Sequence, residues 1–160
     1  HLTSSDATDE YLSWFSDSAT SRFIDYAKAD NSRDNLISYI NSKNLCGSAL
    51  FLGIFSLVDD SHIGNIKFEP IDFLKRSAEM GILIGIKKWR GQGVGPEVIS
   101  GAGLWLREHL NLKLMTLGVS CSNDIAFSAY KKIGFTISRD SEDSPVEDSY
   151  RMSLNLRDID

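Results

Sequence analysis

The sequence of 160 residues is short of cysteine, proline and histidine, and it contains no long apolar run. Its two cysteines, Cys46 and Cys121, cannot form the disulfide framework that holds small secreted domains together. The longest apolar stretch, residues 49–58, is far too short to cross a bilayer, so we expect no membrane contact. The three histidines are scattered and no Cys-x-x-Cys occurs, so we expect no metal. No leader segment is visible, and we expect a cytoplasmic protein.

The charge balance of the chain is acidic. Lysine and arginine number 17 and aspartate and glutamate 22, for a net charge of −5. Such a chain lacks the broad positive surface that non-specific nucleic-acid binding requires, so we expect no nucleic-acid partner. A local basic patch can still bind a smaller anion. With 42% hydrophobic and 24% charged residues, the composition is that of one globular domain over residues 1–160.

Apolar periodicity predicts helices first and strands afterwards. Helical spacing predicts a helix around residues 11–15, capped by the polar residues before it, and a second helix from about Ser32 to Gly47. Three runs then have the character of strands, the first two forming a hairpin and the third following a loop that contains Pro70. These runs are residues 49–58, 62–68 and 78–86.

A glycine-rich turn and a longer helix follow the third predicted strand. Pro96 suits the first turn of this helix, where its missing N–H costs nothing, and Trp105 is expected in the core. The remaining predictions are a strand at 113–119, a short helix at 125–133 that ends at a left-handed Gly134, and strands at 135–138 and 150–156. Helices and strands around one sheet indicate an α/β (α+β) fold.

The segment from Trp89 to Glu97 lies between a predicted strand and a predicted helix. Free main-chain N–H groups at a helix N-terminus attract anions, and glycines lack the Cβ atoms that would keep a phosphate away, so this loop is predicted to bind a pyrophosphate. It is not a Walker A loop, which requires Gly-Lys-Ser/Thr in place of Gly95-Pro96-Glu97. A dinucleotide fingerprint would require a glycine at Pro96 or Val98. A turn that only reverses the chain is the alternative.

The spacing Arg-x-x-Gly-x-Gly, formed by Arg90, Gly93 and Gly95, resembles the acyl-CoA pyrophosphate loop of the GNAT superfamily of N-acetyltransferases. The resemblance implies a GNAT-like fold, with a central mixed, mostly antiparallel sheet, a splayed strand pair and flanking helices. It also implies transfer of an acetyl group from acetyl-CoA to a primary amine.

A second segment is similar to the other signature of that superfamily, Asn-x-x-Ala-x-x-x-Tyr-x-x-x-Gly-Phe. It runs from Asn123 through Tyr130 to Gly134-Phe135 and matches every named position. Taken singly, each residue has a structural explanation, as a helix cap, as packing or as the end of a helix. The joint spacing, following the glycine loop, favours the resemblance.

Three further segments resemble the RimJ/RimL-type branch, which acetylates protein N-termini and has relatives that act on amino sugars and other small amines. They are Asp6 to Trp14, His62 to Ile66 and Ala78 to Gly81. The family begins with a β-strand of which only Leu2-Thr3 could be the end here, so we expect an incomplete first strand.

The resemblance also assigns roles to individual residues. It gives cofactor binding to the loop residues Arg90, Gly91, Gln92, Gly93, Val94, Gly95 and Pro96, although proline offers no N–H. The main chain of Leu83, Ile84 and Gly85 is expected to pair with the pantetheine arm, with which Asn123 would also form a hydrogen bond. Tyr130 stands where the family uses a tyrosine as general acid toward the departing thiolate.

The acceptor amine must lose a proton before it can attack, because an ammonium has no lone pair. Glu79 is the candidate base. A water chain could serve instead, and Glu79 would then be an ordinary surface carboxylate paired with Lys75 or Arg76. The candidates for the substrate side of the cleft are Trp14, His62 and Asn65, although a histidine beside a hairpin turn can equally be a solvated residue.

We expect the acceptor to be a small-molecule amine, with an amino sugar favoured. Such a substrate needs a polar pocket, expected between the first helices around residues 14–26. The alternatives are the amine of a protein N-terminus, which needs an open groove, and a non-catalytic module that only binds acyl-CoA. Strand edges near the C-terminus are compatible with a homodimer.

Overall fold

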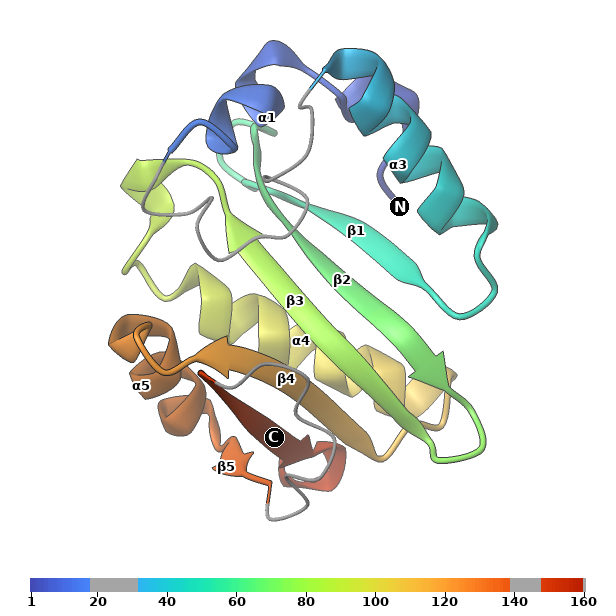
Figure 1. The fold of residues 1–160 in the computed structure, drawn as a ribbon, viewed down its shortest axis with the longest axis vertical. Helices are drawn as coiled ribbons and strands as arrows, with labels where there is room; N and C mark the ends of the chain where they lie inside the picture. The colour runs from blue at the N-terminus through green and yellow to red at the C-terminus, as the bar shows by residue number, and fades with distance from the viewer. Residues whose placement is uncertain (18–31, 139–147, 160) are drawn as a thin grey trace. The chain divides into compact units, whose positions relative to one another are not determined.

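The computed structural model describes residues 1–17, 32–138 and 148–159 (Figure 1). The chain divides into two compact units. Unit 1 comprises residues 1–69 and 81–92, and unit 2 comprises residues 70–80 and 93–160. Six strands form one sheet in the order β1-β2-β3-β4-β6-β5, which is the mixed sheet of the predicted α/β fold.

Unit 1 contains the helices and strands of the first half of the chain. These are α1 (Asp9–Trp14), α3 (Arg33–Leu45), β1 (Leu50–Phe55), most of β2 (His62–Asp72) and the second half of β3 (Ser77–Ile84). The Thr8 side chain accepts a hydrogen bond from the main chain of α1, and that of Ser32 does so for α3. Both helices therefore begin where the capping residues predict, because these side chains satisfy N–H groups that have no partner in the helix.

The predicted hairpin is confirmed. β1 pairs antiparallel with β2 from Leu50 opposite Phe68 to Phe55 opposite His62. The prediction that Pro70 lies in a loop is wrong, because β2 continues to Asp72. Proline is tolerated there because β1 pairs with β2 only as far as Phe68, so no hydrogen bond to β1 requires its missing N–H.

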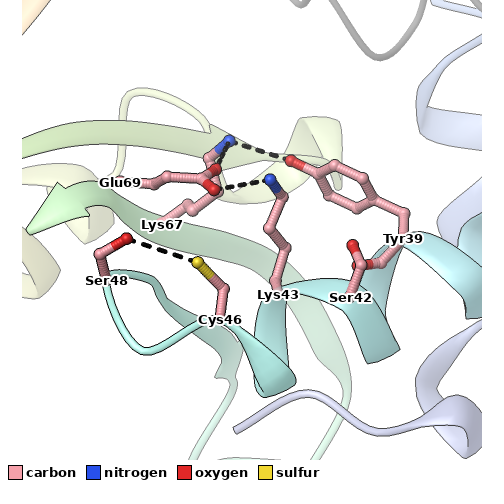
Figure 2. Close-up of polar contacts among 7 residues, drawn as sticks. All are labelled: Tyr39, Ser42, Lys43, Cys46, Ser48, Lys67 and Glu69. Carbon is pink, nitrogen blue, oxygen red and sulfur yellow. Dashed lines mark hydrogen bonds and ion pairs between the residues drawn. The ribbon is translucent and has the colours of Figure 1, made fainter.

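A network of charged side chains connects the last turns of α3 to β2, as Figure 2 shows. Glu69 binds Lys43 Nζ at 2.7 Å and Lys67 Nζ at 3.0 Å, and Lys67 donates to the Tyr39 hydroxyl at 2.9 Å. Burial alone would raise the pKa of Glu69, but the hydrogen bonds from the two lysines outweigh it and lower that pKa. The network holds α3 beside the hairpin by paired charges rather than by apolar packing alone.

Unit 2 contains the rest of the chain. Its elements are the start of β3, α4 (Val94–His109), β4 (Leu114–Ser120), α5 (Asp124–Ile133), β5 (Thr136–Ile137) and β6 (Ser149–Asn155). β4 pairs antiparallel with β6 along its whole length, whereas its parallel ladder with β3 covers only residues 77–79. The splayed strand pair that the family resemblance implies is therefore expected at β3 and β4, beyond this short ladder.

Helix α4 packs on the sheet of unit 2 through a glycine. A Cβ added at Gly103 would meet the side chains of Ile159 and Met115, which explains the absence of a side chain there. The prediction that Trp105 lies in the core is wrong, because this side chain is 41% exposed and stacks on the His109 ring one turn later. Among the described residues, no helix is both long and apolar enough to cross a membrane.

Candidate active site

The glycine loop leads into the N-terminus of α4. Gly91 and Gly93 have φ angles of 73° and 85°, a left-handed conformation that favours glycine. Gly93 caps α4 without a side-chain hydrogen bond. A Cβ added at Gly91, Gly93 or Gly95 would meet nothing within 4 Å. Gly95 is therefore required neither by its φ angle nor by packing within the protein, although glycine weakens a helix.

The first turn of α4 offers main-chain donors to open space. Val94 and Gly95 lie where N–H groups have no acceptor in the helix, and Pro96 has no N–H to leave unpaired. The Glu97 N–H already donates to the Gly93 carbonyl at 3.1 Å. These N–H groups, the helix dipole and the open space over three glycines fit the pyrophosphate of an acyl-CoA.

The Arg90 guanidinium makes hydrogen bonds to other residues of unit 1. Its Nε donates to the Ile84 carbonyl at 2.8 Å and its Nη2 to the Gly85 carbonyl at 2.7 Å, while Nη1 binds Asp17 at 2.7 Å. Arg90 thereby fixes the end of β3 and the residues that follow it. The predicted contact of Arg90 with the cofactor remains a prediction.

The residues after β3 are held closely to the rest of unit 1. The Gly85 N–H donates to the Ile63 carbonyl at 2.9 Å, so both of its main-chain groups are already hydrogen-bonded. A Cβ at Gly85 would lie 2.0 Å from the Trp14 indole, and one at Gly64 would lie 2.3 Å from the Leu83 carbonyl. The end of β3, where Leu83 and Ile84 are expected to meet the pantetheine arm, thus rests against Gly64, and Gly85 just after it rests against Trp14; neither glycine admits a side chain.

Helix α5 has the caps that its sequence predicts. The Asn123 side chain accepts a hydrogen bond from the Ala126 N–H at 3.2 Å, and Gly134 ends the helix with φ of 111°. Both residues therefore have structural roles, and a contact of Asn123 with the cofactor stays a prediction.

Tyr130 lies on α5 and packs on the buried Phe135, with ring centroids 5.7 Å apart. Its hydroxyl makes no hydrogen bond to any residue that the structure describes. Burial raises the pKa of Tyr130 above its usual 10.0. The phenol therefore keeps its proton at neutral pH, as a general acid must.

Glu79 lies on β3 in unit 2, and its carboxylate is bound by Arg151. The Arg151 Nη2 lies 2.8 Å from Glu79 Oε2, and the two side chains are 29% and 36% exposed. The partner is thus on β6 and is neither Lys75 nor Arg76, the two cations closest in sequence. The Glu79 carboxylate on β3 is therefore held by the Arg151 guanidinium from β6, the C-terminal strand.

Asn65 and His62 lie among the aromatic residues of unit 1. Asn65 is buried and donates to the Tyr11 hydroxyl at 2.7 Å. The His62 ring stacks on Phe55 and meets Tyr11 and Trp14 edge-on, so it is not the solvated residue considered as the alternative.

The His62 ring predicts a pH-dependent stability. Neither ring nitrogen has a hydrogen-bond partner among the described residues, and burial lowers the pKa below 6.5. The main chain of Gly64 and the carboxylates of Asp6 and Glu10 offset part of this effect. Because the unfolded chain binds the proton more tightly, stability is expected to fall as the pH drops below about 6.5. Urea titrations of the wild type and of His62→Phe between pH 5 and pH 8 measure this, and an equal acid loss in both would exclude His62 as its source.

A pocket of about 400 Å³ opens in unit 1 between the end of α1 and the residues after β3. Its lining contains Trp14, a candidate for the substrate side of the cleft, together with carboxylates and a lysine that the sequence analysis did not single out. The lining residues are Glu10, Ser13, Trp14, Ser16, Asp17, Gly85, Ile86 and Lys87. Residues 18–26 of the predicted pocket wall lie outside the described residues. No group of three or more metal-ligating side chains occurs in the described parts of the chain.

Comparison with known proteins identifies the class of the protein. The sequence matches the acetyltransferase (GNAT) domain family over residues 1–136. The chain therefore belongs to the GNAT acetyltransferases, and it is an acyl-CoA-dependent N-acetyltransferase. No curated protein matches the sequence.

Solved structures show the same fold at low sequence identity. A chimera of the spermidine N-acetyltransferase SpeG from Vibrio cholerae with hSSAT has 21% identity and a TM-score of 0.79, over 98% of this chain and 93% of that one. A dodecameric spermidine N-acetyltransferase from the same organism has 21% identity and a TM-score of 0.76, over 97% and 91%. Vibrio cholerae SpeG in complex with manganese ions has 23% identity and a TM-score of 0.64, over 79% of this chain and 76% of that one.

Proposed function

We propose that the protein transfers an acetyl group from acetyl-CoA directly to the primary amine of a small molecule. The observation that carries this proposal is the glycine loop. Gly91, Gly93 and Gly95 face open space at the start of a helix, and the need for a glycine at Gly95 is explained by a ligand rather than by the fold. The pyrophosphate of acetyl-CoA is the anion that this family brings to such a loop.

On the donor side, Tyr130 is the proposed general acid. The amine nitrogen attacks the thioester carbonyl carbon, the C–S bond breaks, and the thiolate of CoA takes the phenolic proton. The raised pKa of Tyr130 and its hydroxyl without a partner among the described residues support this role. Asn123 is proposed to hydrogen-bond the pantetheine arm through its side-chain NH₂, since the side-chain oxygen caps α5.

Glu79 is proposed to receive the proton of the amine, directly or through water. Arg151 holds one carboxylate oxygen at 2.8 Å, which fixes the orientation of the side chain and leaves the other oxygen to act as the acceptor. An ordered water between the amine and the carboxylate can pass on the proton where the two do not touch.

On the acceptor side, the pocket of unit 1 supports a small, positively charged amine. Glu10 and Asp17 contribute two carboxylates to its lining, against one lysine. The solved structures of similar fold include spermidine N-acetyltransferases, whose substrate is a small cationic amine. The sequence favoured an amino sugar as the acceptor and a place in the RimJ/RimL-type branch. The amine panel described below tests these two finer assignments.

Release of free CoA thiol from acetyl-CoA, measured with a panel of amines, tests the proposal. The panel contains a linear polyamine, glucosamine and a short peptide with a free N-terminus. Turnover is expected with a small amine and not with the peptide. Turnover with the peptide alone would support the N-terminal acetyltransferase instead. Tight CoA binding without turnover on any amine would support a binding module and contradict the proposal.

A further inference from the structure

One face of the sheet in unit 2 carries small and polar side chains that are not buried. Along β4, and along the parts of β3 and β6 beside it, every second residue is buried and those between are not. Thr116 lies opposite both Glu79 and Ser153, and Gly118 lies opposite Arg151. Because residues opposite one another point to the same side of a sheet, these five residues share the face that is not buried.

Glu79 and Arg151 meet on this face across β4. The contact between Arg151 Nη2 and Glu79 Oε2, at 2.8 Å, is the one hydrogen bond or ion pair of either side chain in the described part of the chain. Neither side chain contributes a buried polar atom without a partner. The second carboxylate oxygen of Glu79 and the other N–H groups of the guanidinium are therefore open to water or to a ligand.

Gly118 lies beside this ion pair and is not required by the fold. Its φ angle is not in the left-handed region, the ladder between β4 and β6 continues through it without a shift, and an added Cβ would meet nothing within 4 Å. A glycine inside a strand weakens the strand, and it often marks a place where a ligand approaches the main chain. The open space over Gly118 gives a small molecule access to Glu79 and Arg151.

We infer that Glu79 and Arg151 together select acceptors with an oxygen atom on the carbon next to the amine-bearing carbon. The inference rests on the proposed function, because it takes Glu79 as the group that receives the proton of the amine. The ion pair presents, side by side, a carboxylate oxygen for the amine and N–H donors for this oxygen. A two-carbon spacing lets one small molecule contact both side chains at once.

Steady-state turnover of 2-aminoethanol and propylamine tests the inference, because a hydroxyl group in one takes the place of a methyl group in the other. Arg151→Met is expected to lower kcat/KM for both amines, since Glu79 loses the group that orients it. It is expected to lower it about ten- to hundredfold more for 2-aminoethanol, the range of a hydrogen bond to a charged group. Comparing wild type and variant cancels the difference in basicity between the two amines.

Two further variants separate recognition of the oxygen from a merely structural role of Arg151. Arg151→Lys keeps a cation for Glu79 but lacks the planar fork that serves two partners. It is therefore expected to restore turnover of propylamine toward the wild-type level without restoring the preference for 2-aminoethanol. Arg157→Met is the matched control, since it removes the same charge from an exposed residue just after β6. It is expected to leave the preference unchanged.

Gly118→Ala adds one methyl group to the open space beside the ion pair. It is expected to raise KM for both amines without lowering Tm, because alanine costs a strand less conformational entropy than glycine does. An unchanged KM would contradict an approach of the acceptor over this residue.

The free amino acid glycine, as a third acceptor, carries a carboxylate where 2-aminoethanol carries a hydroxyl. A preference for either over propylamine that both Arg151 variants lose supports the inference and identifies the kind of oxygen. An equal loss for all three acceptors in both variants, or a preference that survives in them, would overturn it. Turnover without such a preference rejects the inference alone, whereas absence of turnover on every amine rejects the proposed function and the inference with it.

Discussion

Tyr130→Phe is expected to lower kcat by about 10²–10⁴-fold, the usual contribution of a general acid. The variant keeps the ring that packs on Phe135, and the lost hydroxyl has no hydrogen-bond partner among the described residues. Stability and CoA affinity are therefore expected to stay close to those of the wild type. Thiol release under saturating acetyl-CoA and amine measures kcat, and calorimetry with CoA measures the affinity.

Tyr150→Phe supplies the matched control. Tyr150 lies on β6 in the same unit and packs on Phe127 of α5, with ring centroids 4.9 Å apart, so the same hydroxyl is removed beside the same helix. This variant is expected to retain full turnover. The pH profile adds a second check, because burial raises the pKa of Tyr130 and the acid therefore stays protonated in the neutral range, so that a loss of kcat in this range belongs to another group. Full turnover in Tyr130→Phe would remove the phenol from the mechanism.

The local elements of the fold are predictable because their signals are short-range. Ser32 caps α3, Pro96 lies in the first turn of α4, and Gly134 ends α5, all as the sequence indicates. Each of these positions is decided by hydrogen bonds within four residues of it, which the order of residue types specifies.

The partners of the candidate site residues are not predictable in this way. Arg90 binds Asp17, which lies 73 residues earlier in the chain, and Glu79 binds Arg151, which lies 72 residues later. Such pairs depend on strand order and on which faces meet, and no periodicity encodes either. Sequence proximity pointed to Lys75 and Arg76 for Glu79, since β6 could not be placed beside β4 in advance.

His62 shows a further limit of pattern analysis. Residues 62–68 alternate in polarity, which is typical of a strand with one face in water. In the structure residues 63–66 are all buried and His62 lies among aromatic rings, so both faces of this part of β2 are covered. Alternation shows that a strand exists but not how many of its faces are covered.

Gly93→Val is expected to abolish CoA binding. The branched side chain would extend into the open space over the loop, where a phosphate must approach the main-chain N–H groups. It would also strain the main chain, because φ of 85° is unfavourable for a β-branched residue. Calorimetry with CoA is expected to show no heat of binding, and normal affinity would place the pyrophosphate elsewhere.

Two milder variants on α4 distinguish a blocked approach of the phosphate to the main chain from a change in the stability of the helix. Gly95→Ala and Gly101→Ala each add one methyl group to the same helix, and beyond the adjoining residues and main chain of that helix neither added Cβ meets an atom within 4 Å. Both replace a helical glycine by alanine, so both are expected to raise Tm slightly. Only Gly95 lies in the first turn, so only Gly95→Ala should weaken CoA binding, while Gly101→Ala should leave it unchanged. Since added helix stability cannot weaken binding at one position and spare it at the other, this difference would assign the loss to the phosphate contact itself.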